Sequence, residues 1–474
     1  MLGLFGSLNM GRHSLQAHQQ GIEVTGHNLA NVNNPAYARQ RTRLETATPL
    51  STHAGIQGAG VDVGSIAQLR NAFLDRQIAE ELSTGGYWQA RNDSLELMQS
   101  TLGQTIDRHS VRAEGAAAAD IGGQQGIADG IQDFFGAVQT LTTEPASMAQ
   151  RQVLLQQAIS MASRFNETSE RLTGLNAKLN ELVTEKVGES TRLLEGIASL
   201  NDQIATAEVI SSGPANDLRD IRQGKLEELA GLVSYIATED TVGAVNISVG
   251  GVLLVTGERV TETLEAYDPG DGQLGIRAKN SGENLSSLGG SLDGVIESRN
   301  GPLADLRSDL DALAGELIGK INGVHAAGFG LGGGTGEPFF VGSVAVDMAI
   351  NSRLLDNPRL VQASAISGAS GNNEVAMQMA RLADVPQDAL GGLNFSQSFA
   401  RTAAGLGQEL ANAMSQSSDQ QAVERMLKRQ RDSVSGVSLD EEMADLVKYQ
   451  RAYQASAKLI TTIDQMLQTV IALK

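Results

Sequence analysis

The C-terminal stretch, residues 438–474, reads as one long helix and restricts the fold more than any other part of the chain. Ser438 and Glu441 have the spacing of a capping box, in which two side chains satisfy free amide groups at the start of a helix. No glycine or proline follows them, so at 1.5 Å per residue the helix would be about 55 Å long. Apolar residues recur at spacings of three and four, which places them along one face that another element must cover.

The residues of this helix that we expect to contact other helices are mostly apolar or aromatic. Tyr449 and Tyr453 are four residues apart and share a helical face with small side chains. The simplest interpretation is a stripe packed on the chain's own N-terminal helix, and the alternative is a surface that meets neighbouring subunits. A helix has more than one face, so both can hold. The candidate assembly positions here are Leu439, Met443, Leu446, Tyr449, Gln450, Tyr453, Ile460, Ile463 and Leu467.

The N-terminal segment shows a thinner heptad pattern. Leucine or isoleucine recurs every seven residues, while the intermediate positions include Gly11, His18 and Thr25, which are small or polar. Such a helix buries too little apolar surface to be stable alone and needs a partner. We expect it to end near Asn33, because Pro35 disfavours helical geometry in the residue before it. The candidate contact positions are Leu8, Leu15, Ile22 and Leu29.

The middle of the chain changes period. Residues 131–236 have leucine and isoleucine spacings of three and four, typical of packed helices, whereas residues 237–279 alternate with period two and contain turn signals, typical of strands. Helix is expected again at 303–325 and from 373 onward, and residues 102–130 read as a linker. The predicted fold is mainly α with a small β subdomain, in which the N- and C-terminal helices pair as a coiled coil and a long helical bundle forms the middle.

This pattern divides the chain into six segments. We expect the two ends to form one terminal coiled-coil domain, and the middle to form a helical rod domain that carries the β insertion. The segments are 1–70 (N-terminal half of the terminal domain), 71–236 (first part of the rod domain), 237–290 (β subdomain), 291–372 (helix, Gly-rich loop and mixed region), 373–430 (return part of the rod domain) and 431–474 (C-terminal half of the terminal domain).

Composition excludes several functions. Lys and Arg number 36 against 55 Asp and Glu, giving a net charge of −19, and such a polyanion is repelled by nucleic acids and acidic membranes. The chain has no cysteine, so disulfides, thiolate nucleophiles and cysteine-based metal sites are excluded. The first residues lack the basic segment and apolar stretch of a secretory signal, and no apolar run is long enough to span a bilayer. We therefore expect no membrane insertion, and any export would not read a cleavable signal.

No catalytic, cofactor or metal motif is convincing. The loop Gly328–Gly333 formally matches G-x-G-x-x-G, but it follows a predicted helix, whereas nucleotide binding requires a preceding strand and a following helix. The six histidines form no H-x-x-x-H pattern, so solvated or core histidines are the better interpretation. We therefore predict no catalytic residue, no cofactor and no metal, and a protein that is not an enzyme.

Two stretches resemble bacterial flagellar axial proteins, the family of rod, hook and hook-associated proteins. The first, Gly26-His-Asn28-Leu-Ala-Asn31 followed by Pro35, Tyr37 and Arg39-Gln40, is similar to the N-terminal signature of the family. It departs from that signature at two positions, where Asn34 stands for Thr and Ala36 for Gly. Ala36 favours a type I turn at Pro35–Ala36 over a type II turn, which needs positive φ.

The second stretch, from Gly436 to Lys458, resembles the C-terminus of hook-associated members in particular. Further similarities lie between the two, at Asn216–Leu218, Val252–Gly257 and Asn322–Gly328, so the resemblance covers most of the chain. In the first stretch it adds Asn28, Asn31, Pro35 and Tyr37 to the candidate assembly residues.

The resemblance implies a structural subunit at the hook–filament junction, secreted to the extracellular flagellum by the flagellar type III apparatus. Its partners would be further copies of itself in a ring or helical array, the hook protein, a second hook-associated protein, and a cytoplasmic export chaperone on the C-terminal helix. Hook or rod proteins remain the alternative, although their middle should be richer in strands. A coiled-coil chaperone would explain the helices but not the paired terminal motifs.

Overall fold

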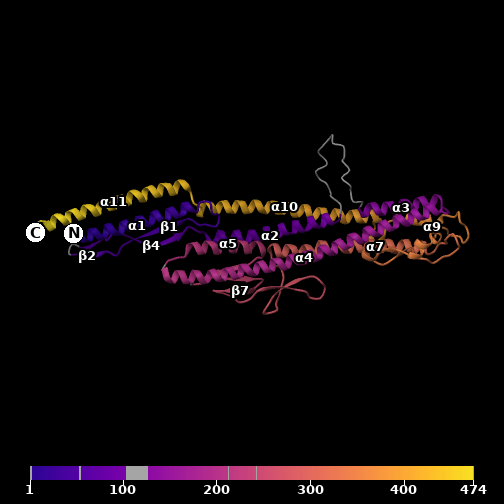
Figure 1. Cartoon of the computed structure of the whole chain (residues 1–474), viewed down its shortest axis with the longest axis horizontal. Coiled ribbons are helices and arrows are strands. Elements are labelled where there is room, and N and C mark those ends of the chain that lie inside the picture. Colours follow the sequence, from indigo (N-terminus) through magenta and orange to yellow (C-terminus); the bar gives the residue numbers. More distant parts are fainter. Residues whose placement is uncertain (1–2, 53–54, 103–125, 212, 242, 473–474) are drawn as a thin grey trace, which may run out of the picture.

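The protein is an elongated molecule whose two ends lie together (Figure 1). The computed structural model describes residues 3–52, 55–102, 126–211, 213–241 and 243–472, so most of the predicted linker 102–130 falls outside the described residues. Within these ranges no helix combines the length and apolarity needed to cross a bilayer. The mainly helical fold with a small β part, predicted from the sequence, is confirmed.

The two chain ends form a slender unit that we call the terminal rod. It contains α1 (Leu4–Ala30), α11 (Leu439–Ala472) and an antiparallel ribbon of β1 (Gln40–Thr46) and β4 (Val61–Gln68), extended by β2 (Leu50–Thr52) and β3 (Gly55–Gln57). The pairing of the terminal helices is as predicted. The ribbon, which pairs Gln40 with Gln68 and Thr46 with Val61, is an element that the sequence analysis did not identify.

The bundle next to the rod consists of long helices. They are α2 (Ala72–Thr101), α3 (Ile127–Thr143), α4 (Met148–Ser211), α5 (Asn216–Leu232) and α10 (Phe395–Ser435), and α10 runs back along α2 (Figure 1). Asn71 caps α2 by accepting hydrogen bonds from the amides of Phe73 and Leu74. The spacings of three and four predicted for α4 mark its packed face, since Leu172, Leu179 and Ile197 have no exposed surface.

The β subdomain packs on the flank of α4. Its strands are β5 (Ile236–Glu239), β6 (Val245–Val249), β7 (Val252–Thr256), β8 (Arg259–Val260), β9 (Leu264–Tyr267), β10 (Gly275–Ala278) and β11 (Asn284–Leu285). They form a four-stranded sheet in the order β5-β6-β7-β8 and a three-stranded sheet in the order β11-β10-β9. Val245, Ile247 and Val249 are buried while the residues between them are only partly covered, as the period-two pattern predicted.

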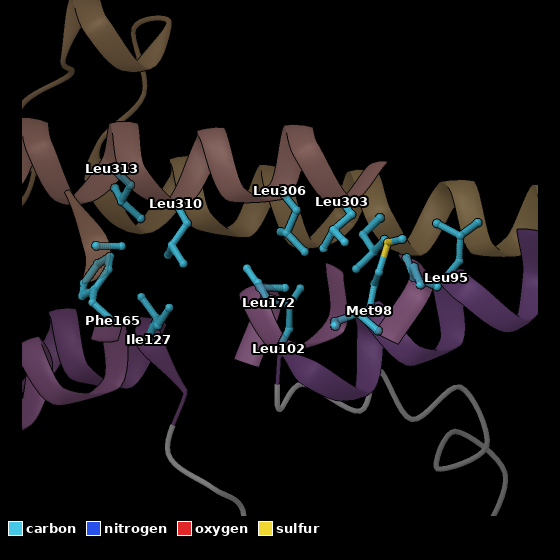
Figure 2. Close-up of a cluster of buried hydrophobic side chains, with 14 of the residues drawn as sticks. Leu95, Met98, Leu102, Ile127, Phe165, Leu172, Leu303, Leu306, Leu310 and Leu313 are labelled. Atoms are coloured by element: carbon cyan, nitrogen blue, oxygen red, sulfur yellow. The ribbon is translucent and has the colours of Figure 1, made fainter. Parts of the chain in front are cut away.

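The chain then returns through α6 (Gly290–Ser298), a π-helical turn η2 (Arg299–Leu303) and α7 (Ala304–His325). A compact tip far from the termini follows, with β12 (Phe340–Val341), β13 (Ala349–Ile350), α8 (Ser352–Asp356), α9 (Glu374–Arg381) and the short turns η3 (Ala345–Asp347), η4 (Pro358–Leu360) and η5 (Asp388–Leu390). Figure 2 shows leucines of α7 meeting side chains of α2, α3 and α4 in the main apolar core.

Candidate assembly site

The two terminal helices contact each other through small and polar residues. A Cβ atom on Gly11 would lie 2.9 Å from the side chain of Ile460, and one on Gly21 would lie 2.7 Å from the ring of Tyr449. Between these glycines, the hydroxyls of Ser14 and Ser456 are 2.9 Å apart. The helices therefore approach closely because α1 presents almost no side-chain volume, as in other small-residue helix contacts.

The two halves of the heptad pattern of α1 are buried to different extents. The intermediate positions Gly11, His18 and Thr25 do face α11 or are buried, whereas the four heptad positions are only partly buried. Branched side chains at those positions do not fit between backbones held this close, so they lie beside the contact. They are Leu8, Leu15, Ile22 and Leu29.

The candidate residues of α11 divide between two faces. Ile463 is buried against the rest of the rod, and a second group is partly buried: Leu446, Tyr449, Tyr453, Ile460 and Leu467. The remaining candidates, Leu439, Met443 and Gln450, are exposed. The helix begins at Leu439, directly after Ser438, as the capping pattern predicted.

Asn28 is the centre of a buried polar cluster that holds the end of α1. Its amide nitrogen donates to the carbonyl of Gln40 (2.9 Å) and to the Glu442 carboxylate (3.0 Å). Its carbonyl oxygen accepts from the Tyr37 hydroxyl (2.7 Å) and from the Gln40 amide (2.9 Å). All four hydrogen-bonding positions of the side chain are satisfied, which joins α1, the start of β1 and α11 in one contact.

Charges reinforce this cluster. The buried Arg39 guanidinium pairs with Glu441 and lies 2.6 Å from Glu442, so that it neutralises the acidic first turn of α11. The hydrogen bond from Arg39 lowers the pKa of Glu441 below its ordinary value. Burial, together with the nearby acidic residues, raises the pKa of Tyr37, and its hydroxyl remains a donor to Asn28.

The signature turn has the geometry expected from its departures. The Tyr37 amide donates to the Asn34 carbonyl (3.1 Å), which closes a turn with Pro35 and Ala36 at its centre. Ala36 does not have positive φ, so the turn is not type II. Asn34 also accepts from the Ala36 amide (3.2 Å), and Asn31 donates to the His27 carbonyl (3.1 Å) at the end of α1. Pro35 and Asn31 thus serve the turn and do not enter the buried cluster.

Two acidic residues of α5 belong to this site, and the sequence analysis did not select them. Asp217 accepts from the Gln40 side chain (2.9 Å), and Asp220 accepts from the Arg70 guanidinium (2.7 Å). Asp217 lies within Asn216–Leu218, one of the internal stretches that carried the family resemblance. Its place in that stretch was the one sequence feature that could have marked Asp217 as a candidate site residue. The spacing of residues in the sequence does not indicate that α5 lies beside residue 40.

The other internal motif, Asn322–Gly328, organises the tip. Asn322 accepts from the amides of Phe339 and Phe340 (both 2.8 Å). The His325 ring accepts from the Gln362 amide (2.9 Å) and contacts the Glu337 carbonyl (2.8 Å). The Gly-rich loop Gly328–Gly333 comes after helix α7. Within this loop, the Leu331 amide donates a hydrogen bond to the Arg359 carbonyl (2.9 Å). Within the described ranges, no group of His, Asp or Glu has the arrangement of a metal site.

Comparison with known proteins agrees with this geometry. A family model described as the helical domain of the flagellar hook-associated protein FlgK matches residues 119–340. A second model, described as the C-terminal domain of the flagellar basal body rod FlgEFG protein, matches residues 428–473. The chain is 28% identical to flagellar hook-associated protein 1 of Bacillus subtilis and 22% identical to that of Escherichia coli, in alignments that cover 98–99% of each chain. The chain thus resembles flagellar hook-associated protein 1 over almost its whole length.

A solved member supports the fold. The structure titled as the flagellar hook junction protein FlgK from Burkholderia pseudomallei superposes with a TM-score of 0.64 at 13% identity and covers 76% of this chain and 100% of that one. The resemblance to flagellar hook-associated proteins that the sequence analysis stated is confirmed. The role of each candidate assembly residue stays a prediction.

Proposed function

We propose that this chain is a structural subunit of the hook–filament junction, not an enzyme. Copies of it assemble into a ring or short helical array on the distal end of the hook, with their terminal rods packed head to tail. A second hook-associated protein adds above them. A head-to-tail contact between identical subunits generates such an array, because each copy offers both halves of the interface.

Two apolar patches of α11, which lie on different faces of the helix and which the rest of the chain leaves uncovered, support this proposal. Leu439, Met443 and Val447 follow one another at spacings of four, and their exposed fractions are 52, 51 and 44%. Leu459, Met466 and Val470 are exposed by 41, 53 and 55% farther along the helix. Isolated apolar residues are ordinary on a protein surface, but a helix with this many exposed along its length is typical of one that binds a partner. The half-buried leucines of α1 lie beside the same helix pair.

The exposed apolar residues of α11 also support a proposal for how the chain reaches the flagellum. We propose that an export chaperone in the cytoplasm covers residues 438–474, that the chain leaves through the flagellar type III apparatus, and that it ends in the extracellular flagellum. In this account residues 1–70 and 431–474 form the assembly domain, while 71–236 and 373–430 form the rod domain. Residues 237–290 form a β insertion, and 291–372 comprise a helix, the Gly-rich loop and a mixed region that includes most of the tip.

One substitution tests the patch that contains Met443. Met443→Asp places a charge where a neighbouring subunit would bury this position. The isolated chain should fold as before, because 51% of Met443 is already exposed to solvent. We expect incorporation into hooks to fall at least tenfold, measured by quantitative blotting of purified hook–basal bodies. Met443→Leu keeps the patch apolar and should incorporate normally. Equal incorporation of both variants would refute the proposed role of this patch.

A further inference from the structure

The terminal rod and the bundle are joined by chain segments without helical structure. The chain crosses between them twice, between β4 and α2 (residues 69–71) and between α10 and α11 (residues 436–438). The loop between α1 and β1, residues 31–39, belongs to the rod and lies beside the second crossing, where the Arg39 amide donates to the Ser435 carbonyl (2.8 Å). We call these three segments the junction. A helix that ran through it would fix the angle between the two parts, but α10 ends at Ser435 and α11 begins at Leu439 (Figure 1).

No apolar core crosses the junction in the part of the chain that the structure describes. The main buried cluster and the residues packed on it begin at Trp88 and end at Ala413. The second cluster is centred on Leu74, Ile78 and Leu427, which belong to α2 and α10. Interfaces between parts of a chain that lack a large apolar contact allow relative motion, because water can replace their polar contacts at low cost.

The contacts that do cross the junction are polar and converge on the first turns of α5. Asp217 accepts from the Gln40 side chain (2.9 Å) and lies 3.6 Å from the His27 ring. Asp220 accepts from the Ala38 amide (3.3 Å) and from Arg70 (2.7 Å). These partners belong to the signature stretch or to the link after β4. The same helix turn also holds β4 through Asn216, whose side chain donates to the Ile66 carbonyl (2.9 Å) and whose backbone carbonyl accepts from the Gln68 side chain (2.8 Å). One turn of α5 therefore carries two carboxylates and one asparagine that contact the rod or its link.

The packing around these contacts is incomplete. A small polar cleft opens at the junction between the signature turn and the end of α10, and it is lined by Pro35, Tyr37, Arg70, Arg431, Asp432 and Ser435, among others. Arg431 reaches across it to the Pro35 carbonyl at 3.4 Å. This cleft has charged walls and lies where the loop 31–39 meets the end of α10, so the contacts at this point are polar and open to water.

We propose that the junction is a hinge and that Asp217 and Asp220 form the latch that fixes the angle between the terminal rod and the bundle. With the latch closed, the rod holds the angle seen here. With it open, the rod swings as a unit, because its own contacts around Asn28 and Arg39 do not involve α5. Copies with different neighbours could then adopt different angles without unfolding either part. This inference does not depend on the proposed place of the chain in the flagellum.

Paired spin labels on the full-length chain test the hinge. The chain has no cysteine, so introduced cysteines are the sole attachment sites. Ser418→Cys with Gln454→Cys joins exposed positions of α10 and α11 across the junction, and Gln16→Cys with Gln454→Cys reports on the rod alone. Pulsed electron paramagnetic resonance then gives the distribution of the distance between the two spin labels of each pair. Asp217→Ala/Asp220→Ala opens the latch, and Glu228→Ala is the matched control, an exposed acidic residue of the same helix.

The outcomes separate a hinge from a general loss of structure. In the labelled chain that keeps Asp217 and Asp220, and in the Glu228→Ala variant, we expect a single narrow distribution of the distance across the junction. In Asp217→Ala/Asp220→Ala we expect this distribution to be at least twofold broader. The rod distance should stay narrow in all three. A junction distance that remains narrow without both carboxylates would overturn the proposal. A rod distance that broadens to the same extent would overturn it too, since the rod would then be melting and not swinging.

Discussion

At the scale of one residue, the side chain of Asn28 explains why the signature stretch has an asparagine at this position. Replacing it with alanine leaves the Tyr37 hydroxyl, the Gln40 backbone and the Glu442 carboxylate without a shared partner, and all three are buried. An unsatisfied buried polar group costs about 1–3 kcal/mol. We expect Asn28→Ala to lower the free energy of unfolding of the rod by at least that amount in chemical denaturation. Asn33→Ala, at an exposed position of the same turn, should have almost no effect.

Gly21 gives a prediction in which two effects have opposite signs. Alanine in place of a helical glycine stabilises an exposed site by about 1 kcal/mol. At Gly21 the new Cβ atom would lie 2.7 Å from the Tyr449 ring, and such overpacking costs about 1–3 kcal/mol. Gly26, on the same helix, has no atom within 4 Å of that position. Thermal unfolding should therefore show Gly21→Ala destabilised and Gly26→Ala stabilised, and a stabilised Gly21→Ala would contradict the close contact.

At the scale of elements, His325 makes the tip sensitive to acid. Burial lowers its pKa to about 4, and its ring accepts a hydrogen bond from the Gln362 amide, which a protonated ring cannot do. The folded pKa is below the ordinary value near 6.5, so this contribution to stability is complete above pH 6.5 and is lost as the pH falls from there towards 4. We expect a loss on the order of 3 kcal/mol by pH 4. His325→Gln should lower stability at pH 7 and remove most of this dependence in pH-dependent denaturation.

Elements with a strong period were predictable from the sequence, and contacts between distant elements were not. The spacings around Leu172 and Ile197 gave α4, and the alternation at Val245–Val249 gave β6, because burial on one face leaves a periodic trace in the sequence. The closest contacts of α1 with α11 involve small residues such as Gly21, which apolar periodicity cannot identify because glycine has no side chain to bury. The β1–β4 ribbon was missed because most residues of β1 are exposed. Asp217 and Asp220 could not be selected, because only the fold brings α5 to the signature turn.

On the scale of the whole molecule, the two apolar clusters lie in the bundle, the β subdomain and the tip, and not in the terminal rod. Both apolar clusters lie between residues 74 and 427, so the fragment 71–430 contains the complete core. We expect this fragment to be soluble, to unfold cooperatively by circular dichroism and to be absent from purified flagella. A fragment that aggregates or shows no cooperative transition would mean that the rod is required for the bundle to fold.

The arrangement of the ends at one side of an elongated body (Figure 1) fits a tube in which the terminal rods pack together and the bundles lie outside them. The most direct test of this account is to locate the protein along the flagellum by electron microscopy, with a label on the β subdomain. The account predicts a single narrow band of label between hook and filament, and hooks without filaments in cells that lack the protein. Label distributed along the hook or the filament, or normal filaments in its absence, would contradict it.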